Sequence, residues 1–119
     1  RGGLAMTAFI TVIWWRDIPA QVVAKDKRRS AKVVLHPRFQ VAIDKAADTA
    51  GLRSYDVYLD EWRKEQRPCG DDLAAEAEAE ATRLENDFPQ PRLKTIIAAG
   101  GLDATRGRVP APPRMADEA

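Results

Sequence analysis

The segment Cys69-Gly70-Asp71-Asp72 combines residue types that could do chemistry at the start of a predicted helix. The dipole of a helix favours a thiolate in front of its N-terminus, so Cys69 is a candidate reactive thiol with Asp71 and Asp72 beside it. A nucleophile also needs a base, and the only histidine, His36, is distant in the sequence. The alternative interpretation is a turn, in which Gly70 gives backbone freedom and Asp71 is the helix N-cap.

The same residues do not complete a metal or cofactor site. Zinc sites use about four ligands, and one cysteine with one histidine supplies too few. Two adjacent aspartates at a helix start are commoner as caps than as magnesium ligands. The sequence also lacks a convincing Ser-His-Asp set, carboxylate pair or dinucleotide-binding glycine motif. It therefore predicts no catalytic residue, no metal site and no cofactor, and an enzyme is the less favoured class.

Two adjacent tryptophans, Trp14 and Trp15, lie in a predicted strand. Successive strand residues point to opposite faces of a sheet, so a core on one side cannot cover both rings. Either helices cover both faces, or one ring is an aromatic anchor for a partner, bordered by Arg16, Asp17 and Gln21. We take the partner-binding interpretation as the leading hypothesis.

A basic run, Lys25-Asp26-Lys27-Arg28-Arg29, follows the tryptophans. Such a run could grip phosphate, but it has no glycine to let backbone amides surround one, and no aromatic residue lies within it for base stacking. A formal net charge of +1 gives no strong whole-molecule attraction to nucleic acid or to an anionic membrane. The run is therefore predicted to be a solvated hairpin tip, and nucleic-acid binding is an unlikely role.

The first part of the chain shows the patterns of strands. β-Branched and aromatic residues predict a strand over 8–17, with shorter strands over 21–25 and 31–35, separated by a turn at Pro19 and by the basic run. Short connections predict an antiparallel meander in the order 1-2-3, which places the first strand at an edge of the sheet.

Helical periodicity begins near Pro37 and continues over most of the remaining chain. It predicts a helix ending at Gly51, a short helix whose apolar face includes Trp62, a long helix with a stripe from Leu73 to Phe88, and a final helix from Pro91 to Gly100. The predicted fold class is α+β, with a three-stranded antiparallel meander followed by three or four helices.

Length and composition predict one domain of 119 residues. The regular patterns span 8–101, whereas residues 1–7 are expected to be a disordered or tag-like N-terminus and residues 102–119 a disordered, proline-containing tail. The single cysteine excludes an intrachain disulfide and fits the reducing cytoplasm. No apolar run is long enough to cross a membrane.

Three parts of the sequence resemble a known family: the run from Thr11 to Val22 with its Trp-Arg-Asp-Ile-Pro-Ala-Gln core, the strand around Lys32, and the run from Pro68 to Leu73. They are similar to the small bacterial proteins of the virulence factor domain family, over roughly 8–101. A similar domain is associated with conserved virulence factor C, which adds HEAT-like repeats that do not follow in this chain.

The family resemblance implies no reaction and no catalytic residue, because the family name records an association with virulence. It also implies a set of partners. The stand-alone members are associated with one-carbon enzymes of the methylenetetrahydrofolate reductase and corrinoid methyltransferase kind, which would suit a small accessory subunit.

These observations together favour a cytoplasmic, non-enzymatic accessory or protein-interaction domain. Its partner is expected to be another protein or a second copy of the chain. If the partner is another protein, a bacterial one-carbon enzyme is a candidate, with this chain as its small subunit. One alternative is an enzyme or redox subunit that uses Cys69 with Asp71 and Asp72. A second alternative is a weak nucleic-acid binder that uses the basic hairpin.

Overall fold

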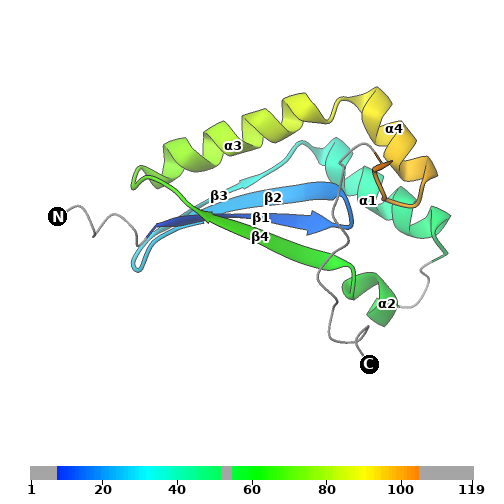
Figure 1. Ribbon diagram of the computed structural model, residues 1–119, viewed down its shortest axis with the longest axis horizontal. Coiled ribbons are helices and arrows are strands. Elements are labelled where there is room, and N and C mark those ends of the chain that lie inside the picture. Colours follow the sequence, from blue (N-terminus) through cyan, green and yellow to red (C-terminus); the bar gives the residue numbers. More distant parts are fainter. Residues whose placement is uncertain (1–7, 52–54, 105–119) are drawn as a thin grey trace.

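The computed structural model describes residues 8–51 and 55–104, and it confirms the α+β fold class (Figure 1). Strands and helices follow one another along the chain much as the sequence predicts, except for one added strand. The elements are β1 (Phe9–Trp15), β2 (Ile18–Lys25), β3 (Ser30–Val34), α1 (Pro37–Thr49), α2 (Tyr55–Leu59), β4 (Trp62–Pro68), α3 (Leu73–Asp87) and α4 (Gln90–Ala98).

The sheet has four antiparallel strands in the order β3-β2-β1-β4. The predicted meander of the first three strands is therefore correct, but β1 is an inner strand and the edge prediction is wrong. The strand that covers it, β4, begins at Trp62, a residue that the periodicity assigned to a helix. Strand β4 carries charged residues on both faces, Lys64 on one and Arg63, Glu65 and Arg67 on the other. Charged side chains on an edge strand protect the sheet from pairing with other chains.

The turn between β1 and β2 is shorter than predicted. It consists of Arg16 and Asp17 alone, and Arg16 takes a left-handed backbone conformation with φ of 53°. Pro19 is not in the turn but in β2, opposite Trp14, beside an irregularity where the pairing skips Ala20. Proline has no N–H to donate, so a position next to a bulge is one that it tolerates within a sheet.

Helix α3 lies along one side of the sheet, whereas α2 lies on the other side, beneath one end of β4 (Figure 1). The buried residues of α3 are Leu73, Ala77, Glu80, Ala81 and Leu84, so the apolar stripe recognised in the sequence does face the sheet. Helix α1 packs against α4 and β2. No helix in the described ranges is long and apolar enough to cross a bilayer.

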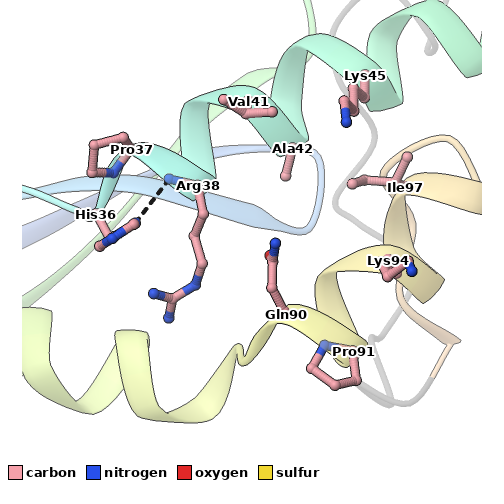
Figure 2. A pocket seen from close by; sticks show the side chains of 10 residues that line it. All are labelled: His36, Pro37, Arg38, Val41, Ala42, Lys45, Gln90, Pro91, Lys94 and Ile97. Carbon is pink, nitrogen blue, oxygen red and sulfur yellow. Dashed lines mark hydrogen bonds between the residues drawn. The ribbon is translucent and has the colours of Figure 1, made fainter.

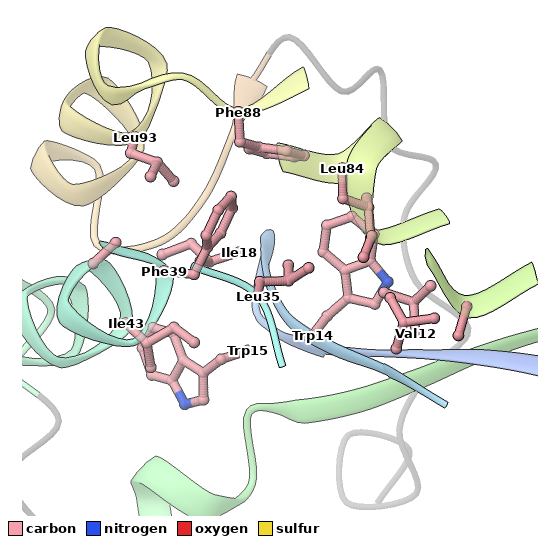
Figure 3. Close-up of a cluster of buried hydrophobic side chains, with 14 of the residues drawn as sticks. Val12, Trp14, Trp15, Ile18, Leu35, Phe39, Ile43, Leu84, Phe88 and Leu93 are labelled. Atoms are coloured by element: carbon pink, nitrogen blue, oxygen red, sulfur yellow. The ribbon is translucent and has the colours of Figure 1, made fainter. Parts of the chain in front are cut away.

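Both adjacent tryptophans are buried, with Trp14 6% exposed and Trp15 0% exposed. Figure 3 shows the two side chains leaving β1 in different directions, as alternation along a strand requires. Trp14 packs edge to face on Phe88, with 6.1 Å between ring centroids. Trp15 stacks on Tyr58 of α2, and its indole N–H donates a 3.0 Å hydrogen bond to the backbone oxygen of Tyr58.

The expectation that one indole needs a cover from outside the chain is therefore wrong. The cover for Trp15 comes from α2 and from the segment after α4, where a Cβ atom placed on Gly101 would lie 2.8 Å from Cζ3 of the Trp15 ring. These segments are remote from Trp15 in sequence, so the local pattern of β1 carries no sign of them.

We expect Gly101→Ala to lower the free energy of unfolding by about 3 kcal/mol, because left-handed strain and overpacking against Trp15 add together. Gly101 has φ of +98° and no room for a Cβ. The matched control is Gly51→Ala, where φ is +74° but no atom lies within 4 Å of the added Cβ. The control should lose only about 1 kcal/mol. Urea unfolding followed by tryptophan fluorescence measures both, and equal losses would contradict close packing at Gly101.

Candidate functional site

Asp17 has a structural position inside the protein, because its side chain is only 1% exposed. Its Oδ2 accepts a 2.7 Å hydrogen bond from the backbone N–H of Asp103, and its own N–H donates to the oxygen of Gly101 at 2.9 Å. The carboxylate of Asp103 is also buried and pairs with Arg92 at 2.7 Å. The folded unit therefore includes Asp103, past the expected boundary at 101, and Asp17 cannot border a docking surface in this arrangement.

Arg16, like Asp17, contacts the segment that follows α4. Its Nη1 donates to the backbone oxygen of Gly100 at 3.0 Å, and its Nε lies 3.2 Å from Oε1 of Glu61, an ion pair without hydrogen-bond geometry. The guanidinium also lies 5.5 Å from the centre of the Trp15 ring. The Trp-Trp-Arg-Asp run thus ties the first hairpin to the end of α4.

The environment of Cys69 raises the pKa of the thiol, whereas a reactive thiol has a lowered pKa. Burial raises the pKa of the half-buried Cys69, the negative charge of Glu76 raises it further, and Arg67 offsets only part of this. Glu76 is held nearby, since its Oε2 accepts a 3.2 Å hydrogen bond from the N–H of Gly70. A raised pKa keeps the sulfur protonated at neutral pH, and the thiol is the poorly nucleophilic form.

The other residues of the predicted reactive segment do not complete a site with Cys69. The N-cap of α3 is Asp72, whose side chain accepts from the N–H of Ala75 at 3.2 Å, and not Asp71 as predicted. No group of three or more His, Cys, Asp and Glu side chains in the described part of the chain could hold a metal ion.

His36 and Cys69 lie toward opposite ends of α3. The backbone N–H of His36 donates to Glu85, near the end of this helix, whereas the loop of Cys69 is bound by Glu76, near its start. These two glutamates are separated by about 13 Å along the helix axis. His36 instead caps α1, because its Nδ1 accepts a 3.0 Å hydrogen bond from the N–H of Arg38.

The basic hairpin tip is closed by Asp26. Its Oδ1 accepts from the N–H groups of Arg28 and Arg29 at 2.8 and 2.7 Å, and its Oδ2 pairs with the Arg29 guanidinium at 2.7 Å. The hydrogen bonds from Arg29, and then from Arg28, lower the pKa of Asp26 from 3.8 to about 2. Part of the positive charge of the run is therefore neutralised within the turn.

The remaining predicted contact residue, Gln21, lies on the side of the sheet away from α3. Pairing places Gln21 opposite Ile13, and alternation places Val23, Thr11 and Lys25 on the same face. The opposite face is the one under α3, because Arg67 of β4 forms an ion pair with Glu80 of that helix at 3.2 Å. We call the exposed side the open face; its residues are Phe9, Thr11, Ile13, Gln21, Val23, Lys25, Ser30, Lys32, Val34, Lys64 and Gln66.

The open face combines apolar and basic side chains. Val34 is 65% exposed and Phe9 is 37% exposed, and a hollow of about 460 Å³ is lined by Thr11, Ile13, Val23, Lys25, Lys64 and Gln66. None of the described strand residues on this face is Asp or Glu. In Figure 1, α2 lies at one end of this side of the sheet, near the end of β4 where Trp62 lies, and the other end is free of helices.

Sequence reasoning found Gln21 but missed the rest of this surface. Lys64 and Gln66 belong to β4, which was not recognised as a strand. Lys25 was placed at the end of the predicted strand 21–25 and considered only as part of the basic run. The alternation of Lys32 with Ala31 and Val33 was the one available signal that a lysine shares a face with Val23.

Fold and surface together define a small α+β domain, with helices packed on one face of a four-stranded antiparallel sheet and a basic-apolar open face on the other. The sequence model of the family described as Virulence factor matches residues 13–97, most of the chain. The chain therefore belongs to the virulence factor family. No curated protein and no solved structure shows significant similarity to it.

We expect Cys69 to react with iodoacetamide at pH 7 more slowly than the thiol of a small unstructured peptide, because its pKa is raised. Glu76→Gln should speed the reaction by removing the negative charge that raises this pKa. Glu78→Gln, on the same helix, is the control for loss of one acid. Mass spectrometry of timed samples gives the rates. Faster reaction than the peptide would support the redox alternative.

We expect the carboxyl carbon of Asp26 to titrate by NMR with a midpoint near 2, and Arg29→Gln to raise this pKa toward 3.8. Because the pKa is lowered in the folded chain, Asp26 stabilises the turn fully above the ordinary carboxyl pKa. That contribution is lost as the pH falls through about 2. An unshifted midpoint in the unsubstituted protein would show that the turn does not hold the carboxylate in solution.

Proposed function

We propose that this member of the virulence factor family is an accessory protein-interaction domain whose open face binds a partner protein. The partner presents acidic side chains next to an apolar patch. The observation that carries this proposal is a sheet face with exposed apolar side chains and lysines, on which no described strand residue is acidic.

The chemistry of the open face fits a protein partner. Ile13 and Val23 provide apolar contact area on the two inner strands, and Val34 adds exposed apolar area on the edge strand β3. Exposed apolar surface of this kind marks interaction sites. Lys25 and Lys64 line the hollow among these residues. Charges around an apolar centre steer a complementary partner and select against a wrong one.

Charge also favours a different protein over a second copy of this chain. A symmetric dimer would bring the same patch of both copies together, and would therefore set lysines of one open face against lysines of the other. Like charges placed together across an interface are unfavourable. An acidic surface on a partner satisfies the same lysines.

The first candidate partners are bacterial one-carbon enzymes of the methylenetetrahydrofolate reductase and corrinoid methyltransferase kind. Support for this choice comes from the family resemblance, which implies a small subunit or partner of these enzymes, in the cytoplasm. The alternatives based on Cys69 and on the basic hairpin have less support, given the raised pKa of the thiol and the pairing of Asp26 with Arg29.

We expect the double substitution Lys25→Glu with Lys64→Glu to weaken partner binding by at least about tenfold. The matched control is Lys45→Glu with Lys94→Glu, which makes the same charge change on exposed lysines of α1 and α4. Biolayer interferometry against the purified one-carbon enzymes of the source bacterium measures binding, and circular dichroism checks that both variants fold.

A photo-crosslinking residue locates the partner independently of its identity. Placed at Val23 on the open face, it should capture a bacterial protein in the cell, whereas the same residue at Glu78, on the exposed side of α3, should not. Capture of a second copy of the chain, capture of nucleic acid, or equal capture from both positions would contradict the proposal.

A further inference from the structure

A groove between α1 and α4 lies apart from the open face and has a different composition. Its volume is about 720 Å³, and Figure 2 shows its lining side chains extending from both helices. Pockets for small molecules usually have volumes of about 300–1,000 Å³. The lining residues are His36, Pro37, Arg38, Val41, Ala42, Lys45, Gln90, Pro91, Lys94 and Ile97.

Every charged side chain that lines the groove is basic. Arg38, Lys45 and Lys94 contribute positive charge, and none of the ten lining residues is Asp or Glu. At the edge of the groove, Glu85 accepts a hydrogen bond from the backbone N–H of His36. A concave site lined by charges of one sign concentrates ligands of the opposite sign.

Arg38 is held in place without being neutralised. Its Nη2 donates to the backbone oxygens of Glu85 and Phe88 at 2.8 and 3.2 Å, and its guanidinium lies 4.7 Å from the centre of the Phe39 ring. These partners are neutral groups. Within the described ranges, Arg38, Lys45 and Lys94 form no ion pair.

The groove is also lined by apolar side chains. Val41 is 49% exposed although it is on a helix that packs into the core, and Ile97 is half-buried. Figure 2 places Val41 and Ala42 on α1 and Ile97 on α4, with the Ile97 side chain directed toward α1. Pro37 and Pro91 add apolar surface at the starts of the two helices.

We propose that this groove binds a small amphipathic anion, a molecule with a carboxylate, phosphate or sulfonate group on an aromatic or aliphatic body. The lysines and Arg38 provide the charge that the anionic group requires, and Val41, Ala42 and Ile97 contact the body. Gln90, which faces Arg38 across the groove in Figure 2, supplies an amide that donates to the anion. The groove and the open face share no residue, so this site is independent of the proposed function.

The test uses a pair of dyes that differ in one charged group. 8-Anilinonaphthalene-1-sulfonate carries the anionic group, and N-phenyl-1-naphthylamine has the same aromatic body without it. Fluorescence titration of the folded chain should show tighter binding of the sulfonate. Backbone amide shifts in an NMR spectrum should change at Val41, Ala42 and Ile97, and not at Thr11 or Val23 of the open face.

Two charge variants separate the groove from a general effect of positive charge. Lys45→Gln with Lys94→Gln should weaken binding of the sulfonate dye about tenfold and leave the neutral dye unchanged, because each exposed charge contributes modestly. Lys25→Gln with Lys64→Gln makes the same charge change on the open face and should leave both dyes unchanged.

The apolar wall is tested by Val41→Asp, an exposed position where the change should not disturb the core. It should weaken binding of both dyes, the sulfonate more. The proposal is overturned if the two dyes bind equally, if both lysine pairs have the same effect, or if the amide shifts map to the open face. Each of these outcomes can be measured whether or not a protein partner binds the open face.

Discussion

The structure depends on how the corner between β1 and β2 is closed. Asp17 and Arg16 bind the backbone of the segment after α4, while Trp15 lies beneath Gly101 and stacks on Tyr58. A two-residue turn with one left-handed residue other than glycine is unfavourable on its own. Here the buried charge of Asp17 and the large buried indole of Trp15 fix it from both sides, so the N-terminal hairpin and the last helix form one unit.

Closure of this corner explains which surfaces remain for function. Both indoles, Arg16 and Asp17 are used inside the protein, so the residue types that looked most like a docking anchor serve folding. The surface that remains on the sheet is less conspicuous in sequence. It is formed mainly by β-branched residues, lysines and uncharged polar residues from all four strands, and only the pairing register brings them together.

Local patterns predicted much of the fold. The stripe of α3, the proline at the start of α1 and the meander of the first three strands are each encoded within a few neighbouring residues. The strand β4 was missed because it carries Arg63, Lys64, Glu65 and Arg67 and no apolar alternation, and its conformation comes from pairing with β1. The burial of Trp15 was missed for a similar reason, since Tyr58 is 43 residues away from it. Of the predicted contact residues, only Gln21 lies on the open face.

The bond between Asp17 and Asp103 joins residues separated by 86 positions, and this has a consequence for biosynthesis. During translation the first hairpin leaves the ribosome long before the segment that seals it. Trp15 therefore has no complete cover until nearly all of the described chain has emerged, and native closure of this corner comes late in folding. A growing chain with this topology exposes both indoles of β1 to chaperones for most of its synthesis, although the finished protein buries them.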